Sequence, residues 1–183
     1  MATQASNSEL VAALLRIEGK GEIVDGEIVL MPQAGGLHGS ASLNICVSLR
    51  EYARRARFGR AYGDNVGFLV DLPRRKSFSP DACLYVGPPP GPHLLQGAPL
   101  LAVEVRSLDD YGPVAERAMA AKRADYFAAG TQVVWDVEVV REGWIAVYRA
   151  GAVDSPKVYR RGETAEAEPA LPGWTFPVDV LFE

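Results

Sequence analysis

The hydrophobic pattern is clearest in the middle of the chain, where two apolar runs flank a helical segment. The runs cover residues 100–106 and 131–137, and the helical segment covers residues 113–129. Proline suits the first turn of a helix and glycine suits its C-terminal end, and Pro113 and Gly130 occupy these places. This spacing predicts two parallel strands joined by a right-handed crossover helix.

Two further helices are predicted nearer the N-terminus. In residues 37–57, apolar side chains recur at three- and four-residue spacing and form a stripe that faces a core. The stripe consists of Leu37, Ala41, Ile45, Leu49, Tyr52 and Ala56. His38 lies beside it in the first turn, where a lone histidine usually faces solvent or caps the helix. Residues 8–16 predict a short amphipathic helix with Ser8 or Asn7 as its N-cap.

Alternating apolar and polar residues predict strands elsewhere in the chain. Residues 22–31 predict a β-hairpin that turns at Asp25-Gly26. Further short strands are expected within residues 60–71 (two, around Asp64-Asn65), 81–86, 144–149 and 157–160, with a short last element at 178–182, whereas 87–99 and 162–176 resemble loops. Together these patterns predict an α/β fold, with a mixed central sheet flanked by helices and an N-terminal hairpin, in one domain over residues 1–183.

The net charge of the chain bears on whether it can bind nucleic acid or another polyanion. The formal net charge of −4 gives no overall attraction to nucleic acid, so any binding of a polyanion must come from a local patch. One candidate patch ends the long helix, and a second precedes Asp81; they comprise Arg50, Arg54, Arg55, Arg57 and Arg60, and Arg74, Arg75 and Lys76. A solvated surface is the default interpretation of such clusters, and contact with phosphate is the alternative.

Other sequence features exclude several classes of site. Cys46 and Cys83 lie in apolar patterns without CxxC spacing, which indicates buried thiols. With only His38 and His93, a multi-histidine zinc site is excluded, and no Walker A, GxGxxG or GxSxG motif is present. The N-terminus lacks a signal pattern and no apolar run reaches membrane-spanning length, so a cytoplasmic enzyme or binding protein without membrane association is expected.

Two acidic residues stand in apolar strands. Glu104 lies within Leu-Ala-Val-Glu-Val, and Asp81 opens the predicted strand 81–86. An unpaired buried carboxylate is unfavourable, and two carboxylates that converge repel each other unless a cation lies between them. Mg²⁺ often binds through one or two carboxylates plus water and phosphate oxygens. An ion pair of Glu104 or Asp81 with Arg106, which shares a face with Glu104, is an equally open interpretation.

Lys122 favours the metal interpretation. Only four of the 19 basic residues are lysines, and Lys122 lies on or beside the helix stripe that packs against the sheet. The common alternative is a lysine that extends from the edge of the stripe into solvent. A crossover helix, however, packs over the strand before it, so the amine can reach the carboxyl end of that strand. Two acids, a cation and a lysine together can cleave a phosphodiester.

Several short motifs follow one another along the chain. They are Asp25-Gly26-Glu27 before a long helix, Ser79-Pro80-Asp81, Val103-Glu104-Val105-Arg106-Ser107, Lys122 with Tyr126, Val134-Trp135-Asp136-Val137 and Val147-Tyr148-Arg149. In this order and spacing, the motifs resemble the Uma2 family (DUF820) of bacterial proteins in the PD-(D/E)XK nuclease superfamily. The resemblance covers residues 22–149 and extends loosely to the last strand.

The resemblance implies a restriction-endonuclease-like core and a Mg²⁺-dependent site, with Mn²⁺ as a substitute ion. It implies Asp81 and Glu104 as metal ligands, Glu27 as an additional acid and Lys122 as the catalytic lysine. Two positions depart from the pattern. The third signature position is Arg106, a poor mimic of lysine, and Leu108 replaces the usual proline after Ser107.

Two functions of different classes follow. The first is a metal-dependent endonuclease acting on DNA, as one chain or as a homodimer, with phosphate contacts from Arg106, His38, Arg74 and Arg75. The second is a catalytically weak relative that keeps the fold as a nucleic-acid or protein-binding module, with Arg106 neutralising the acids in place of metal. The four residues Glu27, Asp81, Glu104 and Lys122 favour the nuclease.

Overall fold

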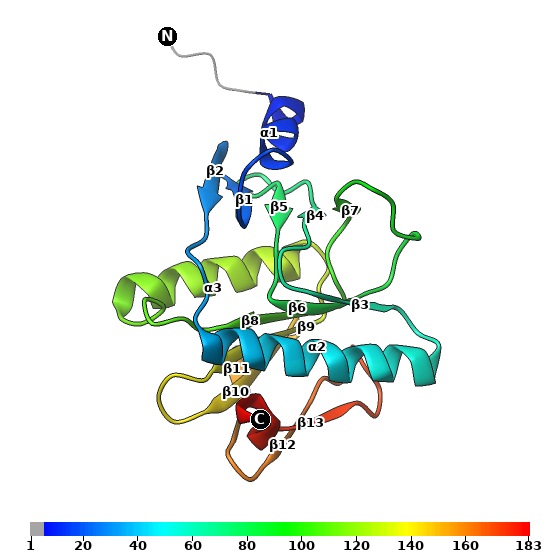
Figure 1. Ribbon diagram of the computed structural model, residues 1–183, viewed down its shortest axis with the longest axis vertical. Helices are drawn as coiled ribbons and strands as arrows, with labels where there is room; N and C mark the ends of the chain where they lie inside the picture. Colours follow the sequence, from blue (N-terminus) through cyan, green and yellow to red (C-terminus); the bar gives the residue numbers. More distant parts are fainter. Residues whose placement is uncertain (1–5) are drawn as a thin grey trace.

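A six-stranded sheet lies between two long helices in the computed structural model, which describes residues 6–183 (Figure 1). Helix α3 covers one face of this sheet and helix α2 the other. The strand order is β11-β10-β9-β8-β6-β3. The bounds are α2 (Gly36–Ala56), β3 (Arg60–Gly63), β6 (Ala82–Tyr85), β8 (Leu101–Val105), α3 (Pro113–Ala128), β9 (Val133–Glu138), β10 (Trp144–Arg149) and β11 (Ala152–Arg160).

The predicted crossover unit is confirmed. Strands β8 and β9 are parallel neighbours, with Glu104 opposite Asp136, and α3 connects them. The other neighbouring strands of this sheet pair antiparallel, so the sheet is mixed, as predicted. Gly130 follows α3 with a φ of 102°, a left-handed conformation that glycine adopts readily.

The alternation of side chains decides where the two acids point. In β6, Ala82 and Leu84 belong to the apolar cluster on the α2 side, whereas Cys83 and Tyr85 pack with Tyr126 of α3. Because alternate residues of a strand share a face, Asp81 continues the row of Cys83 and Tyr85. In β8, Ala102 belongs to this α3-side cluster too, so Glu104 points toward α3 as well.

Helix α2 has the predicted length, but its buried stripe is displaced. The buried residues are His38, Ala41, Ser42, Ile45, Leu49 and Ala53, while the predicted member Leu37 is 53% exposed. The three central positions were predicted correctly, but the helical period of 3.6 puts His38 and Ala53 in the stripe in place of Leu37 and Tyr52, and the predicted member Ala56 is exposed. His38 therefore lies on the buried side of the helix, not in solvent.

The N-terminal region forms a hairpin arm that lies on the α3 side of the main sheet, beside strand β5 (Ser77–Phe78) (Figure 1). Strands β1 (Gly21–Val24) and β2 (Glu27–Leu30) pair antiparallel and turn at Asp25-Gly26, as predicted. Helix α1 (Asn7–Leu14) begins one residue earlier than expected. Its N-cap is Ser6, because Ser6 and Glu9 form a reciprocal capping box.

Several very short elements were not predicted. Strands β5 (Ser77–Phe78) and β7 (Leu95–Gln96) form a separate three-stranded sheet with β4 (Phe68–Leu69), so the expected loop 87–99 contains a strand. Strand β4 itself is the second of the two strands expected within residues 60–71. The tail contains β12 (Thr164–Glu166) and β13 (Thr175–Pro177) before the short helix η1 (Val178–Phe182). Strands of two or three residues are too short to show a period. Within residues 6–183, none of the helices has the length and apolar character needed to cross a bilayer.

Glu138 stabilises the turn between β9 and β10. It is 1% exposed, and its carboxylate accepts hydrogen bonds from the backbone N–H groups of residues 140–143 at 2.6–3.0 Å and from the hydroxyl of Tyr111 at 2.7 Å. Burial acts to raise the pKa of Glu138, but these donors outweigh it and lower that pKa. The ionised carboxylate therefore stabilises the folded state.

Glu138→Gln should lower the free energy of unfolding by about 2 kcal/mol at pH 7, because an amide has only one acceptor oxygen for these donors. A group with a lowered folded-state pKa contributes stability above its unfolded pKa of about 4.3 and loses it as the pH falls through the folded-state pKa. Urea unfolding at pH 7 and pH 3 measures this. An equal difference between the two proteins at both pH values would contradict the assignment.

Candidate active site

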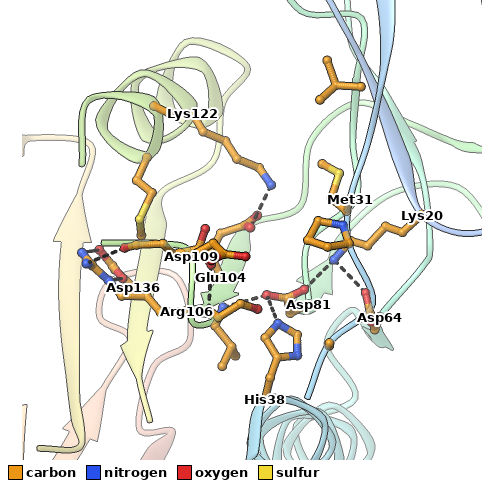
Figure 2. A pocket seen from close by; sticks show the side chains of 18 of the residues that line it. Lys20, Met31, His38, Asp64, Asp81, Glu104, Arg106, Asp109, Lys122 and Asp136 are labelled. Carbon is orange, nitrogen blue, oxygen red and sulfur yellow. Dashed lines mark hydrogen bonds and ion pairs between the residues drawn. The ribbon is translucent and has the colours of Figure 1, made fainter. Parts of the chain in front are cut away.

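Asp81 and Glu104 face one pocket of about 690 Å³. The hairpin arm, the start of α2, the ends of the central strands and α3 surround it, and Figure 2 shows the acids between Lys122 on one side and Lys20 on the other. Apolar residues of the arm form part of the wall, namely Val29, Leu30, Met31 and Pro32.

Asp81 is bonded through both oxygens. Its Oδ1 lies 2.5 Å from the amine of Lys20, and its Oδ2 accepts the backbone N–H of Val105 at 2.7 Å. The Nε2 atom of His38 lies 3.2 Å from the same Oδ2. Burial acts to raise the pKa of Asp81, but His38 and Lys20 outweigh it and hold this pKa below its usual range.

Glu104 has a different electrostatic environment. Its Oε2 accepts the amine of Lys122 at 2.8 Å, and its Oε1 accepts the hydroxyl of Tyr126 at 2.7 Å. Burial raises the pKa of Glu104, and the nearby charges of Asp81 and Glu22 raise it further against the effect of Lys122. Glu104 is thus the acid whose charge is least compensated, which suits a group that receives a cation.

Lys122 links Glu104 to a third acid. Its amine lies 2.8 Å from Glu104 and 2.9 Å from Oε1 of Glu22, a buried residue of β1. Burial acts to lower the pKa of Lys122, but the two carboxylates outweigh it and raise that pKa. The structure therefore brings Asp81, Glu104 and Lys122 into one site, with Lys122 in its charged form.

Glu27, the expected additional acid, lies elsewhere. It is exposed at the start of β2 and lies outside the pocket, whereas Glu22 reaches Lys122 from the neighbouring strand. The expectation that Glu27 shares the cleft is therefore not met. Glu22 is fixed by the backbone N–H of Ser79 at 2.8 Å and by an ion pair with Arg75.

Lys20 is a second lysine of the site that sequence reasoning missed. It precedes β1 by one residue and stands two positions before Glu22, so the two share a face of the strand. This spacing, together with the rarity of lysine in the chain, was the available signal. The amine of Lys20 also lies 2.7 Å from Asp64, which was expected only as a turn residue.

Arg106 pairs with neither Asp81 nor Glu104. Its guanidinium forms two bonds of 2.8 Å with Asp136 and further bonds with Glu116, and it lies 5.1 Å from the ring centroid of Trp144. Both open interpretations of Arg106 as a counter-ion of the site acids are therefore wrong. Arg106 borders the pocket, but its charge is committed to Asp136, on the adjacent strand β9.

The expected phosphate contacts of Arg74 and Arg75 also have other partners. Arg75 is buried and pairs with Glu22 and Asp125. It therefore holds Glu22, which contacts Lys122, and is not free to bind phosphate. Arg74 is exposed and forms a two-bond pair with Asp25 at the tip of the hairpin arm. His38 borders the pocket, where it contacts Asp81.

The ligand set suits a hard cation held by few protein groups. Among residues 6–183, no group of three or more His, Cys, Asp or Glu side chains is close enough to form a metal cluster. Asp81 and Glu104 nevertheless offer carboxylate oxygens to one pocket, and Mg²⁺ commonly uses one or two carboxylates and completes its shell with water. Carboxylate oxygens of this kind suit a hard divalent cation. In this structure one oxygen of each acid accepts a lysine amine, from Lys20 or Lys122.

Comparisons with known proteins agree with this fold. The family model Uma2, described as "Putative restriction endonuclease", matches residues 11–179. A solved structure from Anabaena variabilis ATCC 29413, described as "a putative nuclease belonging to DUF820", superposes with a TM-score of 0.75 at 16% identity. The superposition covers 94% of this chain and 97% of the other, which shows a shared fold. Comparison with curated proteins by sequence finds no match.

Proposed function

Because the chain belongs to the Uma2 family, we propose that it is a Mg²⁺-dependent endonuclease that hydrolyses phosphodiester bonds of DNA. The family and the solved neighbour indicate a nuclease; the metal and the substrate are proposed from the site. One observation carries the proposal: Asp81 and Glu104 face one pocket, and the Lys122 amine lies 2.8 Å from Glu104. Two acids and a lysine are the groups that this chemistry requires.

Asp81 and Glu104 would hold the ion. When bound, Mg²⁺ polarises the phosphate and lowers the pKa of a water molecule. Lys122 has a raised pKa and remains an ammonium, so it acts as a hydrogen-bond donor and not as a proton acceptor. Its place beside Glu104 lets it orient the attacking water or stabilise the charge that develops on the phosphate.

Tyr126 keeps Glu104 in position for this role. Its hydroxyl donates to Oε1 of Glu104, and its ring stacks on Phe78 with centroids 4.0 Å apart. The ring is fully buried, so the hydroxyl has a fixed place. One oxygen of Glu104 is thereby restrained while the other faces Lys122.

The basic end of α2 supports DNA as the substrate. Arg50, Arg54, Arg55, Arg57 and Arg60 are all exposed. His38 at the other end of the helix borders the pocket, and 20 residues of helix span roughly 30 Å. This distance approaches one turn of duplex DNA, and under this proposal the arginines contact phosphates away from the cleaved bond.

Nicking of supercoiled plasmid DNA tests the proposal. The parent should convert the plasmid to nicked and linear forms with Mg²⁺ or Mn²⁺, and EDTA should stop the reaction. Protein carrying Glu104→Gln, purified in parallel, controls for contaminating nucleases. DNA binding without cleavage under all these conditions would instead support the catalytically weak binding module.

A further inference from the structure

Lys20 bridges two acids at the mouth of the site. Its amine lies 2.5 Å from Oδ1 of Asp81 and 2.7 Å from Oδ1 of Asp64 (Figure 2). The Lys20 side chain is 15% exposed and borders the pocket, whereas Asp64 is 42% exposed. Lys20 therefore has one partner within the site and another nearer to solvent.

The two oxygens of Asp81 are not equivalent. Oδ2 is fixed by the backbone N–H of Val105 and lies next to the His38 ring. Oδ1 is held by Lys20, whose long side chain has many rotatable bonds. Oδ1 is consequently the oxygen that a cation can take without disturbing backbone, since only the Lys20 amine has to leave it.

We propose that Lys20 is an exchangeable counter-ion of Asp81, and this rests on the proposed function. A divalent cation that enters the pocket replaces the Lys20 amine on Oδ1 of Asp81. Lys20 remains bonded to Asp64 and stays at the pocket wall, where its ammonium binds a phosphate oxygen of the substrate. Lys20 thus compensates the charge of Asp81 in the empty site and binds substrate in the loaded one.

Asp64 provides a partner for the Lys20 amine after the amine has left Asp81. A lysine that leaves Asp81 without another partner would leave a partly buried charge unpaired, which is unfavourable. Asp64 removes this difficulty, because it already contacts the amine at 2.7 Å. Loss of Lys20 should therefore tighten cation binding, whereas loss of the Asp64 charge should weaken it.

Calorimetric titration with Mn²⁺, in the absence of DNA, tests the exchange. Lys20→Met should bind Mn²⁺ about tenfold more tightly than the parent, and Asp64→Asn should bind it several-fold more weakly. Arg123→Met and Asp109→Asn are the matched controls, because both residues border the pocket and neither contacts Lys20 or Asp81. These controls should change the Mn²⁺ affinity much less. Thermal unfolding of each variant establishes that it is folded.

The substrate role is measured separately. At saturating Mn²⁺, in a Lys122→Met background that prevents cleavage and keeps both proposed metal ligands, Lys20→Met should weaken binding of a short DNA duplex about threefold or more. Duplex affinity equal to that of the Lys122→Met protein would overturn this role.

The outcomes separate this inference from the proposed function. Equal effects of Lys20→Met and Arg123→Met on Mn²⁺ affinity would show a general effect of charge and overturn the exchange. A parent that nicks DNA with Mn²⁺, together with a Lys20→Met protein of unchanged Mn²⁺ affinity, would overturn the exchange alone. Absence of both Mn²⁺ binding and nicking in all variants would overturn the proposed function with it.

Discussion

Asp81→Asn and Glu104→Gln should each reduce metal-dependent nicking by at least about 100-fold, but only Asp81→Asn should lower the stability of the fold. The ionised form of Asp81 is stabilised by Lys20 and the N–H of Val105, so loss of its charge should lower the free energy of unfolding by about 2 kcal/mol. The charge of Glu104 is opposed by burial, Asp81 and Glu22. Glu104→Gln should therefore leave stability unchanged or raise it by up to about 1 kcal/mol.

Urea unfolding in EDTA, beside the plasmid assay, measures both effects. The two measurements separate catalytic from structural roles. Both variants should lose nicking activity, whereas their free energies of unfolding should differ from each other. If both variants unfold at much lower urea than the parent, the two acids belong to structural ion pairs. Retained nicking in either variant would contradict its assignment as a metal ligand.

Lys122→Met should lower the free energy of unfolding by about 3 kcal/mol and abolish nicking, because it removes the cation between two buried carboxylates. Lys122 contacts both Glu104 and Glu22, and these two acids already raise the pKa of Lys122. Without the ammonium, Glu104 and Glu22 repel each other across a buried space.

A double-mutant cycle with Glu104→Gln measures the coupling. In the Glu104→Gln background, Lys122→Met should cost much less stability, because one of the two repelling charges is gone and Glu22 retains Arg75. Nicking should stay absent in the double variant. Additive losses of stability would mean that Lys122 acts mainly through packing of its aliphatic stem.

The sequence was most informative where a long stretch of regular hydrophobic spacing contained a charged residue at an apolar position. The crossover unit was predictable because sixteen helical residues between two apolar runs show a clear pattern. Glu104 and Asp81 stood out because carboxylates in apolar strands need partners, and Lys122 stood out on a stripe that faces the sheet. For these three residues, local spacing favoured convergence but left an ion pair with Arg106 equally open, and the family resemblance supported the site.

The remaining partners depended on which strands become neighbours. Arg106 shares a face with Glu104, as expected, but the adjacent strand β9 presents Asp136 directly opposite Glu104 and captures the guanidinium. Glu22 and Glu27 flank the same hairpin turn, and only the docking of the arm decides which of them is buried. Periodicity along one segment carries no information about contacts made by another.

The hairpin arm has a consequence for dynamics. Lys20 and Glu22 belong to the arm, whereas Asp81, Glu104 and Lys122 belong to the main sheet and α3. The arm is joined to the body by backbone hydrogen bonds from Asp25 to Arg74 and from Lys76 to Ile23, and by the Ile23 N–H, which donates to the hydroxyl of Ser77. A local opening that breaks these bonds removes both arm residues from the acids without unfolding the central sheet. The ion pairs of the site therefore depend on how often the arm opens while the central sheet stays folded. Amide hydrogen exchange at Ile23 measures this opening directly.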